Sequence, residues 1–381
     1  MSITRTSKMA AFIIMLFLLA IFIVVYQNNN KPAPWSPGKP LDKNAVKIAI
    51  LYLDGAETGY SYAHDTGIRK AMQELGLRDN QIIRKLDVKD IDTAMIEHMI
   101  NEAIAEGANI IIATSWSYMD TCEKMASKHP NVIFAHASGY KSNDSNFTNY
   151  FGRIYQARYL SGIVAGLKTK ANKVGFVAAM DKSNSEVTGG LNAFALGVES
   201  VNPNAEIYVN VTHSWFDPSG ERQAAQKLLD EGCDVIAQHC DTPAPQIEAE
   251  KVGVWGIGYN SDMSREAPGA VLTSVIWNWG AYYAFLINSV INGSFTTKPY
   301  FGGMADGMVD ITPLNSALAT PDMESAVAGA RLRILSENFN VFDGAMETND
   351  GRIIGRAGET LSDAEIAGAI DWYYRNIAQL K

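Results

Sequence analysis

The body of this 381-residue chain repeats itself, and the repeat constrains its fold more than any other feature. Three short segments recur in the same order at an almost constant offset. The matching pairs are Lys47–Ile50 with Lys173–Phe176, Ala105–Ile112 with Asp230–Ala237, and Ile133–Ser138 with Gly256–Ser261. In each unit, short apolar runs alternate with segments of helical periodicity, which is typical of a parallel sheet covered on both faces. The repeat therefore predicts an α/β protein with two similar Rossmann-like lobes and a ligand site between them.

The segments that follow the repeat are expected to join the two lobes again. Residues 271–276 and 301–310 are predicted to recross between the lobes, and a helix is predicted to begin at about Trp277. Three crossings of this kind form hinges that allow lobes to close around a ligand. The expected first lobe comprises residues 46–152 and 276–300, and the expected second lobe comprises residues 153–275 and 301–381.

The N-terminal region predicts a membrane segment. An uninterrupted apolar run, residues 9–26, follows Arg5 and Lys8, and it is just long enough to span a bilayer. The preceding positive charges place the N-terminus inside and the rest of the chain outside. No Ala-x-Ala cleavage signal follows, so we expect an uncleaved transmembrane anchor, with a cleaved signal helix as the alternative. Residues 27–45 form a linker, and the location is extracytoplasmic, in the periplasm or at the cell surface.

Composition excludes several classes of function. The net charge of −9 argues against nucleic acid as a partner. Cys233 and Cys240 lie on one predicted strand, too far apart to bridge, so these two and Cys122 are expected to be buried thiols. The sequence contains no P-loop, zinc-protease or serine-hydrolase motif. We therefore expect no metal, no cofactor and no enzymatic activity.

Polar and aromatic residues follow several predicted strands, at the end where ligands bind in open α/β sheets. The first such loop carries two tyrosines and a glutamate instead of a glycine-rich phosphate cradle. The candidate binding residues are Glu57, Tyr60, Tyr62, Ser115, Trp116, Trp215, Asp241, Asn260 and Trp277. The polar loop Ser183–Glu186 also resembles a ligand loop more than an acid–base site. Aromatic rings beside hydrogen-bonding groups suit a flat, polar, uncharged ligand.

Each candidate has a structural alternative. The aromatic residues of the set are either ligand contacts or ordinary packing residues. Glu57 either accepts a hydrogen bond from the ligand or complements a helix dipole. Asp217 precedes a proline and is expected to be a helix N-cap, which leaves Trp215 as the ligand contact of that loop. Asp241 either binds ligand or caps the helix that follows Pro243.

Six ordered blocks resemble the basic membrane protein family, also called PnrA-like, of substrate-binding proteins for ABC importers. The blocks are Gly59–Gly67, Tyr155–Gly166, Asn192–Gly197, Ser214–Pro218, Gly258–Asp262 and Thr273–Ile276. The resemblance covers roughly residues 46–375. It implies a type I periplasmic-binding fold, a purine base or nucleoside as ligand, and an ABC permease as partner.

The departures from the family pattern bear on the ligand. Tyr60 stands where a tryptophan is common, and Asn260 stands where the nucleoside-binding branch has an aspartate. Trp277 replaces a lysine that in that branch resembles a ribose contact. Loss of that cation favours a free base such as adenine. Two other hypotheses remain: a membrane-tethered purine sensor or regulator that uses the same cleft, and a nucleoside-cleaving enzyme, although the clustered acids that such chemistry needs are missing.

Overall fold

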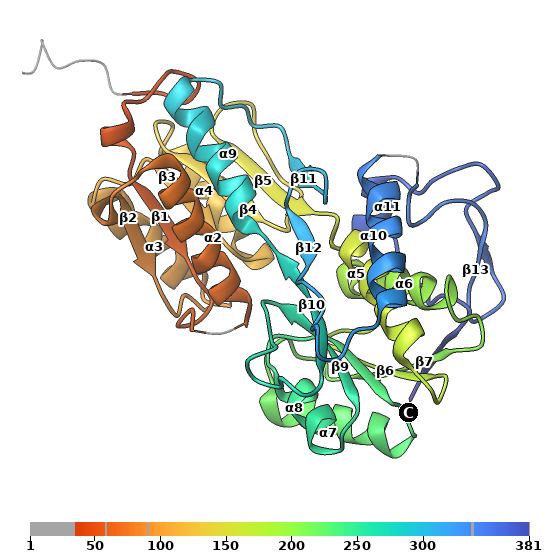
Figure 1. Ribbon diagram of the computed structural model, residues 1–381. Helices are drawn as coiled ribbons and strands as arrows, with labels where there is room; N and C mark the ends of the chain where they lie inside the picture. The colour runs from red at the N-terminus through yellow and green to blue at the C-terminus, as the bar shows by residue number, and fades with distance from the viewer. Residues whose placement is uncertain (1–34, 58, 90, 337–338, 381) are drawn as a thin grey trace, which may run out of the picture. The chain divides into compact units, whose positions relative to one another are not determined.

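Two parallel β-sheets, each covered by helices on both faces, organise the part of the chain that can be described (Figure 1). The computed structural model describes residues 35–57, 59–89, 91–336 and 339–380. Within these residues, no helix has both the length and the apolar composition that crossing a bilayer requires. The predicted anchor at residues 9–26 lies outside the described residues.

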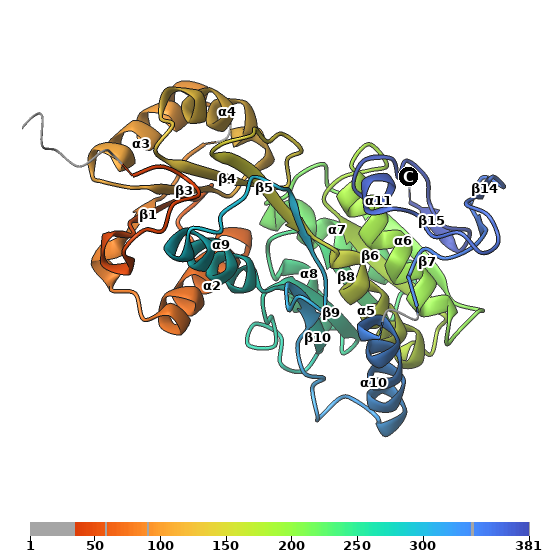
Figure 2. The same ribbon diagram turned by 90° about the horizontal axis from the view of Figure 1, so that it is seen from above.

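The first sheet has the strand order β11-β5-β4-β3-β1-β2, and its strand pairs are parallel. Its strands are β1 (Ile48–Leu51), β2 (Ile82–Lys85), β3 (Ile110–Ala113), β4 (Ile133–Ala137), β5 (Phe147–Gly152) and β11 (Tyr300–Gly302). Its helices are α2 (Gly59–Leu75), α3 (Thr93–Ala105), α4 (Met119–Lys128) and α9 (Trp279–Asn292). Figure 2 shows α3 and α4 on one face of this sheet and α2 and α9 on the other. The strands β1, β3 and β4 are buried along their whole length, as runs of apolar residues in a doubly covered sheet should be.

The second sheet has the order β12-β10-β9-β8-β6-β7-β15, with parallel pairs except for the antiparallel pair β10–β12. Its strands are β6 (Lys173–Ala178), β7 (Glu206–Val211), β8 (Val235–His239), β9 (Trp255–Asn260), β10 (Val271–Trp277), β12 (Val309–Ile311) and β15 (Ile377–Gln379). Its helices are α5 (Ile154–Lys168), α6 (Ser185–Glu199), α7 (Pro218–Asp230), α8 (Ala244–Lys251), α10 (Pro321–Leu335) and α11 (Asp363–Gly368). A short hairpin, β13 (Met346–Glu347) with β14 (Ile353–Ile354), completes the C-terminal region.

The repeated units thus fold as the two predicted Rossmann-like lobes of a type I periplasmic-binding fold. The chain passes between the sheets at three places: at Arg153 between β5 and α5, at Asn278 between β10 and α9, and through residues 303–308 between β11 and β12. The predicted helix after β10 begins at Trp279 rather than at Trp277, because Trp277 still pairs with Val309 in the sheet.

Local sequence signals explain where several helices begin and end. The prediction that Asp217 caps a helix is confirmed: its carboxylate accepts from the backbone N–H groups of Ser219 and Gly220, and a proline occupies the first helical position. Asn184 caps α6 in the same manner. Gly293 ends α9 in the left-handed conformation, φ 71°, which glycine adopts without a steric penalty. The three cysteines are buried thiols, as expected.

Candidate functional site

Asp241 and Asn260 form a hydrogen-bonded pair at the carboxyl ends of two neighbouring strands of the second lobe. Asp241 lies just after β8, and Asn260 is the last residue of β9. The amide Nδ2 of Asn260 donates to Oδ1 of Asp241 at 2.6 Å. Asn260 has φ 67°, a left-handed conformation that asparagine tolerates better than most residues. Its other amide atom, Oδ1, is buried and has no hydrogen-bond partner among the described residues, so it is an acceptor available to a ligand.

The environment of Asp241 favours its protonated form. Burial, and secondarily the nearby acids Glu221, Asp54 and Glu186, raise the pKa of Asp241 to about 8, while the hydrogen bond from Asn260 opposes this shift. The alternative that Asp241 caps the following helix is wrong. Pro243 occupies the N-cap position of α8, and the side chain that accepts from the N–H of Ala244 in its first turn is that of Thr242, at 3.3 Å. One oxygen of the carboxyl group, Oδ1, accepts from Asn260, and the group is not used to cap α8.

A second carboxyl group, Glu186, lies in the first turn of α6 beside two ring systems. Its Oε1 is 3.4 Å from Nε2 of His239 and 3.4 Å from the hydroxyl of Tyr259. Burial raises the pKa of Glu186 to about 7, against the opposing effects of the Tyr259 hydrogen bond and the charge of Arg158. Burial, followed by the charge of Arg158, lowers the pKa of His239. A neutral His239 that donates from Nε2 to Glu186 presents Nδ1, which is buried and unpaired among the described residues, as an acceptor.

Arg158 packs against the ring of Tyr259 in this group. Its guanidinium carbon lies 4.3 Å from the ring centroid of Tyr259, and its Nη1 donates to the carbonyl of Gln238 at 2.6 Å. The side chain is completely buried, and burial lowers its pKa to about 10, which leaves it charged at neutral pH. The stacked guanidinium fixes the position of the Tyr259 ring and balances part of the negative charge of Glu186.

A column of aromatic rings runs from the first lobe to this polar group. The imidazole of His64 stacks on Trp279 at 4.2 Å, and Trp279 stacks on Trp277 at 4.5 Å. The indole N–H of Trp277 then donates to the hydroxyl of Tyr259 at 3.0 Å. Tyr60 meets His64 edge to face at 4.4 Å. Nε2 of His64 and Nε1 of Trp279 are buried and unpaired among the described residues, so the column also carries unused polar atoms.

The residues expected from the sequence fall into two groups. The first group lies in or beside the cluster just described and comprises Tyr60, Trp215, Asp241, Asn260 and Trp277. The ring of Trp215 is 5.9 Å from that of His239. The pKa of Tyr60 is raised by burial and also by nearby groups, among them Glu186 and Asp241. Of the other four, Glu57, Tyr62 and Trp116 are exposed, and Ser115 is buried with its hydroxyl bonded to that of Ser117.

The binding residues expected from the sequence did not include His239, Tyr259, His64 or Trp279, and Glu186 was expected only as part of the polar loop Ser183–Glu186. A signal for Glu186 was present in the internal repeat. The offset between Lys47 and Lys173 aligns the polar loop before Glu186 with the loop before Tyr60, so both loops follow the first strand of their lobe. The stacking of His64 on Trp279 joins residues far apart in the chain, and no local pattern marks it.

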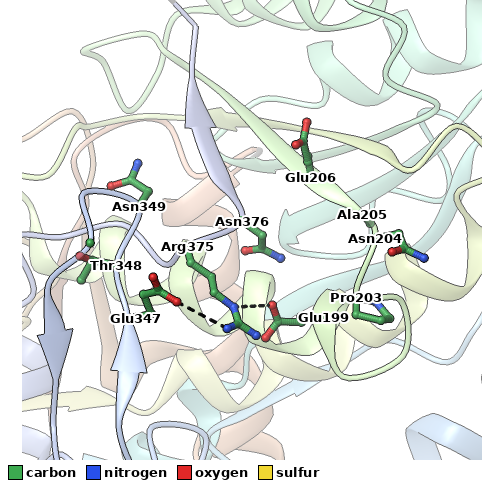
Figure 3. Close-up of a pocket in the computed structure, with 11 residues that line it drawn as sticks. Glu199, Pro203, Asn204, Ala205, Glu206, Glu347, Thr348, Asn349, Arg375 and Asn376 are labelled. Carbon is green, nitrogen blue, oxygen red and sulfur yellow. Dashed lines mark hydrogen bonds and ion pairs between the residues drawn. The ribbon is translucent and has the colours of Figure 1, made fainter.

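A separate polar depression of about 560 Å³ lies near the C-terminal segment (Figure 3). Arg375 points between Glu199 and Glu347 there; its Nε is 2.9 Å from Glu199 and its Nη1 is 3.7 Å from Glu347. Glu206 lines the same depression and is the first residue of β7, at the amino end of the strand. Ligands of open α/β sheets bind at the opposite end, so this depression is not the candidate site.

The site is suited to binding, since it combines flat aromatic faces with unpaired acceptors and donors. Among the residues that the structure describes, no group of His, Cys, Asp and Glu is arranged to hold a metal ion. Among the described residues, the hydroxyl bonded to the Glu186–His239 pair is that of Tyr259, which also accepts from the indole N–H of Trp277.

Comparison with known proteins identifies relatives of the whole body of the chain. The family model described as "ABC transporter substrate-binding protein PnrA-like" matches residues 46–338. A purine-binding protein of Brucella abortus is 32% identical over 333 residues, which cover 85% of this chain and 90% of that protein. A putative ABC transporter glucose-binding protein of Haloferax volcanii, TsgA13, is 34% identical over 312 residues, 81% of this chain and 77% of that protein. A solute-binding protein of an ABC transporter system from Conexibacter woesei shares the fold, with a TM-score of 0.64 and 19% identity over 77% of this chain and 98% of its own.

Proposed function

Because this chain belongs to the PnrA-like family of ABC transporter substrate-binding proteins, we propose that it binds a purine base, with adenine favoured, and delivers it to an ABC permease. The observation that carries the proposal is the set of buried, unpaired polar atoms among stacked rings. Its members are Oδ1 of Asn260, Nδ1 of His239, Nε2 of His64 and Nε1 of Trp279. Such atoms are costly to bury unless a ligand or water satisfies them.

A purine matches this arrangement in shape and in polarity. Its flat ring stacks on aromatic side chains, and each such contact contributes roughly 1–3 kcal/mol. Its edges carry both donors and acceptors, which the pair Asp241–Asn260 at the ends of β8 and β9 and Glu186 at the start of α6 complement. We assign Tyr60, Trp215 and Trp277 to the ring faces. Glu57, Tyr62, Ser115 and Trp116 are proposed as contacts at the edge of the site.

Binding without chemical conversion agrees with the family, whose members capture substrates outside the cytoplasm and are not enzymes. The mechanism is differential binding: separated lobes admit the ligand, and closure of the lobes stabilises the ligand-bound state. The three chain crossings at Arg153, Asn278 and residues 303–308 supply the hinges.

Calorimetric titration of the protein with adenine, adenosine and glucose tests the assignment. Glucose is included because one relative is named a glucose-binding protein. Tight binding of adenine with no measurable heat from glucose supports the proposal. Tight binding of glucose and none of adenine contradicts it and assigns the rings to a sugar instead.

The first prediction concerns the choice between base and nucleoside. We expect adenine to bind about tenfold more tightly than adenosine, because the bulky ring of Trp277 occupies space that a sugar needs and lacks the charge of a ribose-binding lysine. Trp277→Ala should weaken adenine binding and narrow or reverse that preference. Trp277→Phe is the comparison variant, since it keeps an aromatic face but removes part of the ring bulk and the N–H that donates to Tyr259. A wild-type preference for adenosine, or an alanine variant with both affinities unchanged, would make Trp277 a purely structural residue.

The second prediction concerns attachment to the membrane, which we propose is through residues 9–26. The apolar run is preceded by basic residues and is followed by no cleavage signal. The full chain should stay in the membrane fraction after a high-salt wash, and a chain that starts at Lys31 should appear in the supernatant. A mature N-terminus mapped by mass spectrometry between about residues 27 and 35 would show instead that the segment is a cleaved signal.

A further inference from the structure

The first residue of α2, Gly59, lies directly against the second lobe. An ideal Cβ atom placed on Gly59 would be 2.7 Å from the backbone carbonyl oxygen of Asp241 and 3.2 Å from the Cβ atom of Asp241. The first of these distances is shorter than non-bonded carbon and oxygen atoms tolerate, so any side chain at this position would clash. Gly59 also has φ 62°, a backbone conformation that residues with a Cβ atom adopt only at a cost. Two independent features thus require glycine here.

The atoms that Gly59 meets have little freedom to move aside. The backbone N–H of Asp241 donates to the carbonyl of Trp215 at 2.9 Å, and its side chain accepts from Asn260 at 2.6 Å. The clash would be with a backbone carbonyl of a residue that is held by these two hydrogen bonds, whereas the end of a flexible side chain could rotate away. Since packed interiors shift only slightly, the lobes would have to separate to make room.

The position of Gly59 also ties this contact to the ligand site. The next residue, Tyr60, lies near Glu186, Asp241 and Tyr259 of the second lobe, and these groups, after burial, contribute to its raised pKa. Seating the start of α2 on Asp241 therefore brings the Tyr60 ring against the polar groups that we assign to ligand binding. Helix α2 contacts β9 of the second lobe as well, so the contact is part of a continuous surface between lobes.

We propose that Gly59 is a positioning residue for closure: its bare Cα lets the N-terminus of α2 seat on the Asp241 carbonyl, and this contact encloses the ligand. The proposal extends the proposed function from the contacts of the ligand to the movement that retains it. It predicts that a side chain at position 59 weakens binding through lobe separation, while the fold of each lobe is kept.

Two variants separate the clash from backbone strain. Gly59→Ala adds both a Cβ atom and left-handed strain, whereas Gly59→Asn adds the Cβ atom at a position that asparagine tolerates, with less strain. Gly253→Ala is the matched control, because Gly253 has φ 73° and nothing lies within 4 Å of its Cβ position. It carries the strain without the clash. Thermal unfolding of each variant reports whether the fold survives.

Lobe separation is measured on the full chain by pulsed electron–electron double resonance between two spin labels. The labels are attached to cysteines that replace two exposed lysines, Lys124 on α4 and Lys227 on α7. We expect a short-distance population in the wild type that grows with adenine and is lost in both Gly59 variants, with the dissociation constant for adenine raised at least about tenfold. Gly253→Ala should match the wild type. Unchanged distances and affinity in Gly59→Asn, or no short-distance population in the wild type, would overturn the proposal. If adenine does not bind the wild type, the proposed ligand is wrong. The role of Gly59 is still tested in that case, because the distances recorded without ligand compare lobe separation in the wild type and the Gly59 variants.

Discussion

Adenine is expected to bind at least about 100-fold more tightly than AMP, a difference of about 2.8 kcal/mol. The proposed site includes the carboxyl groups of Asp241 and Glu186, and the nearby Glu186 contributes to the raised pKa of Asp241. The nearest cation on the same network, Arg158, lies under the ring of Tyr259 and donates to the carbonyl of Gln238. A dianionic phosphate placed here would lose its hydration without gaining a counter-charge, and that loss is large.

The experiment is a calorimetric series of adenine, adenosine and AMP on the same protein preparation. The ratio of adenosine to AMP isolates the phosphate, and the ratio of adenine to adenosine isolates the sugar. We expect the phosphate to weaken binding at least about tenfold beyond the roughly tenfold effect of the sugar, because burial of its charge is costly. Comparable affinities for adenine and AMP would contradict the assignment of this acidic cluster as the ligand site.

The fold could be predicted because it follows from a sequence pattern that repeats along the chain. An apolar strand with a helix after it, repeated at a constant offset, specifies two similar parallel sheets whatever the other residues are. Single-residue signals such as the proline after Asp217 then marked helix starts correctly. The start of α9 was misplaced by two residues because Trp277, an apolar residue before a helix, pairs with a later strand that local sequence does not reveal.

The candidate site was less predictable because it depends on contacts between distant segments. Asp241 and Asn260 were selected from their places after strands, and parallel neighbouring strands bring such residues together. The stacking of His64 on Trp279, by contrast, depends on the packing of α2 against α9, which local sequence does not reveal. Trp116, a tryptophan at another strand end, is 56% exposed, and its role as a ligand contact stays a prediction.

Replacing Asp241 is expected to have the other large effect on binding. Asp241→Ala should weaken adenine about 100-fold, since it removes an acceptor for the ligand and leaves Nδ2 of Asn260 without its partner in a buried site. Asp241→Asn should cost less, because the amide oxygen still accepts from Asn260. Glu186→Gln, at the other carboxyl group of the cluster, is the matched control and should weaken binding by less than about tenfold.

The pH dependence of adenine binding tests whether Asp241 accepts a hydrogen bond from the ligand. Burial raises the pKa of Asp241 to about 8, so at pH 7 the ligand-free site holds it mainly protonated. A purine N–H that donates to this group favours the carboxylate and lowers its pKa, so binding releases a proton. By linkage the affinity for adenine should then rise with pH until about pH 8 and level off above it, because above that pH the ligand-free site has already lost the proton.

Calorimetric titrations at pH 7 in phosphate and in Tris buffer report how many protons binding releases. The Glu186→Gln variant should still release the proton from Asp241, whereas Asp241→Asn should lose that release; equal proton release by Asp241→Asn and the wild type would show that Asp241 does not accept a hydrogen bond from the ligand.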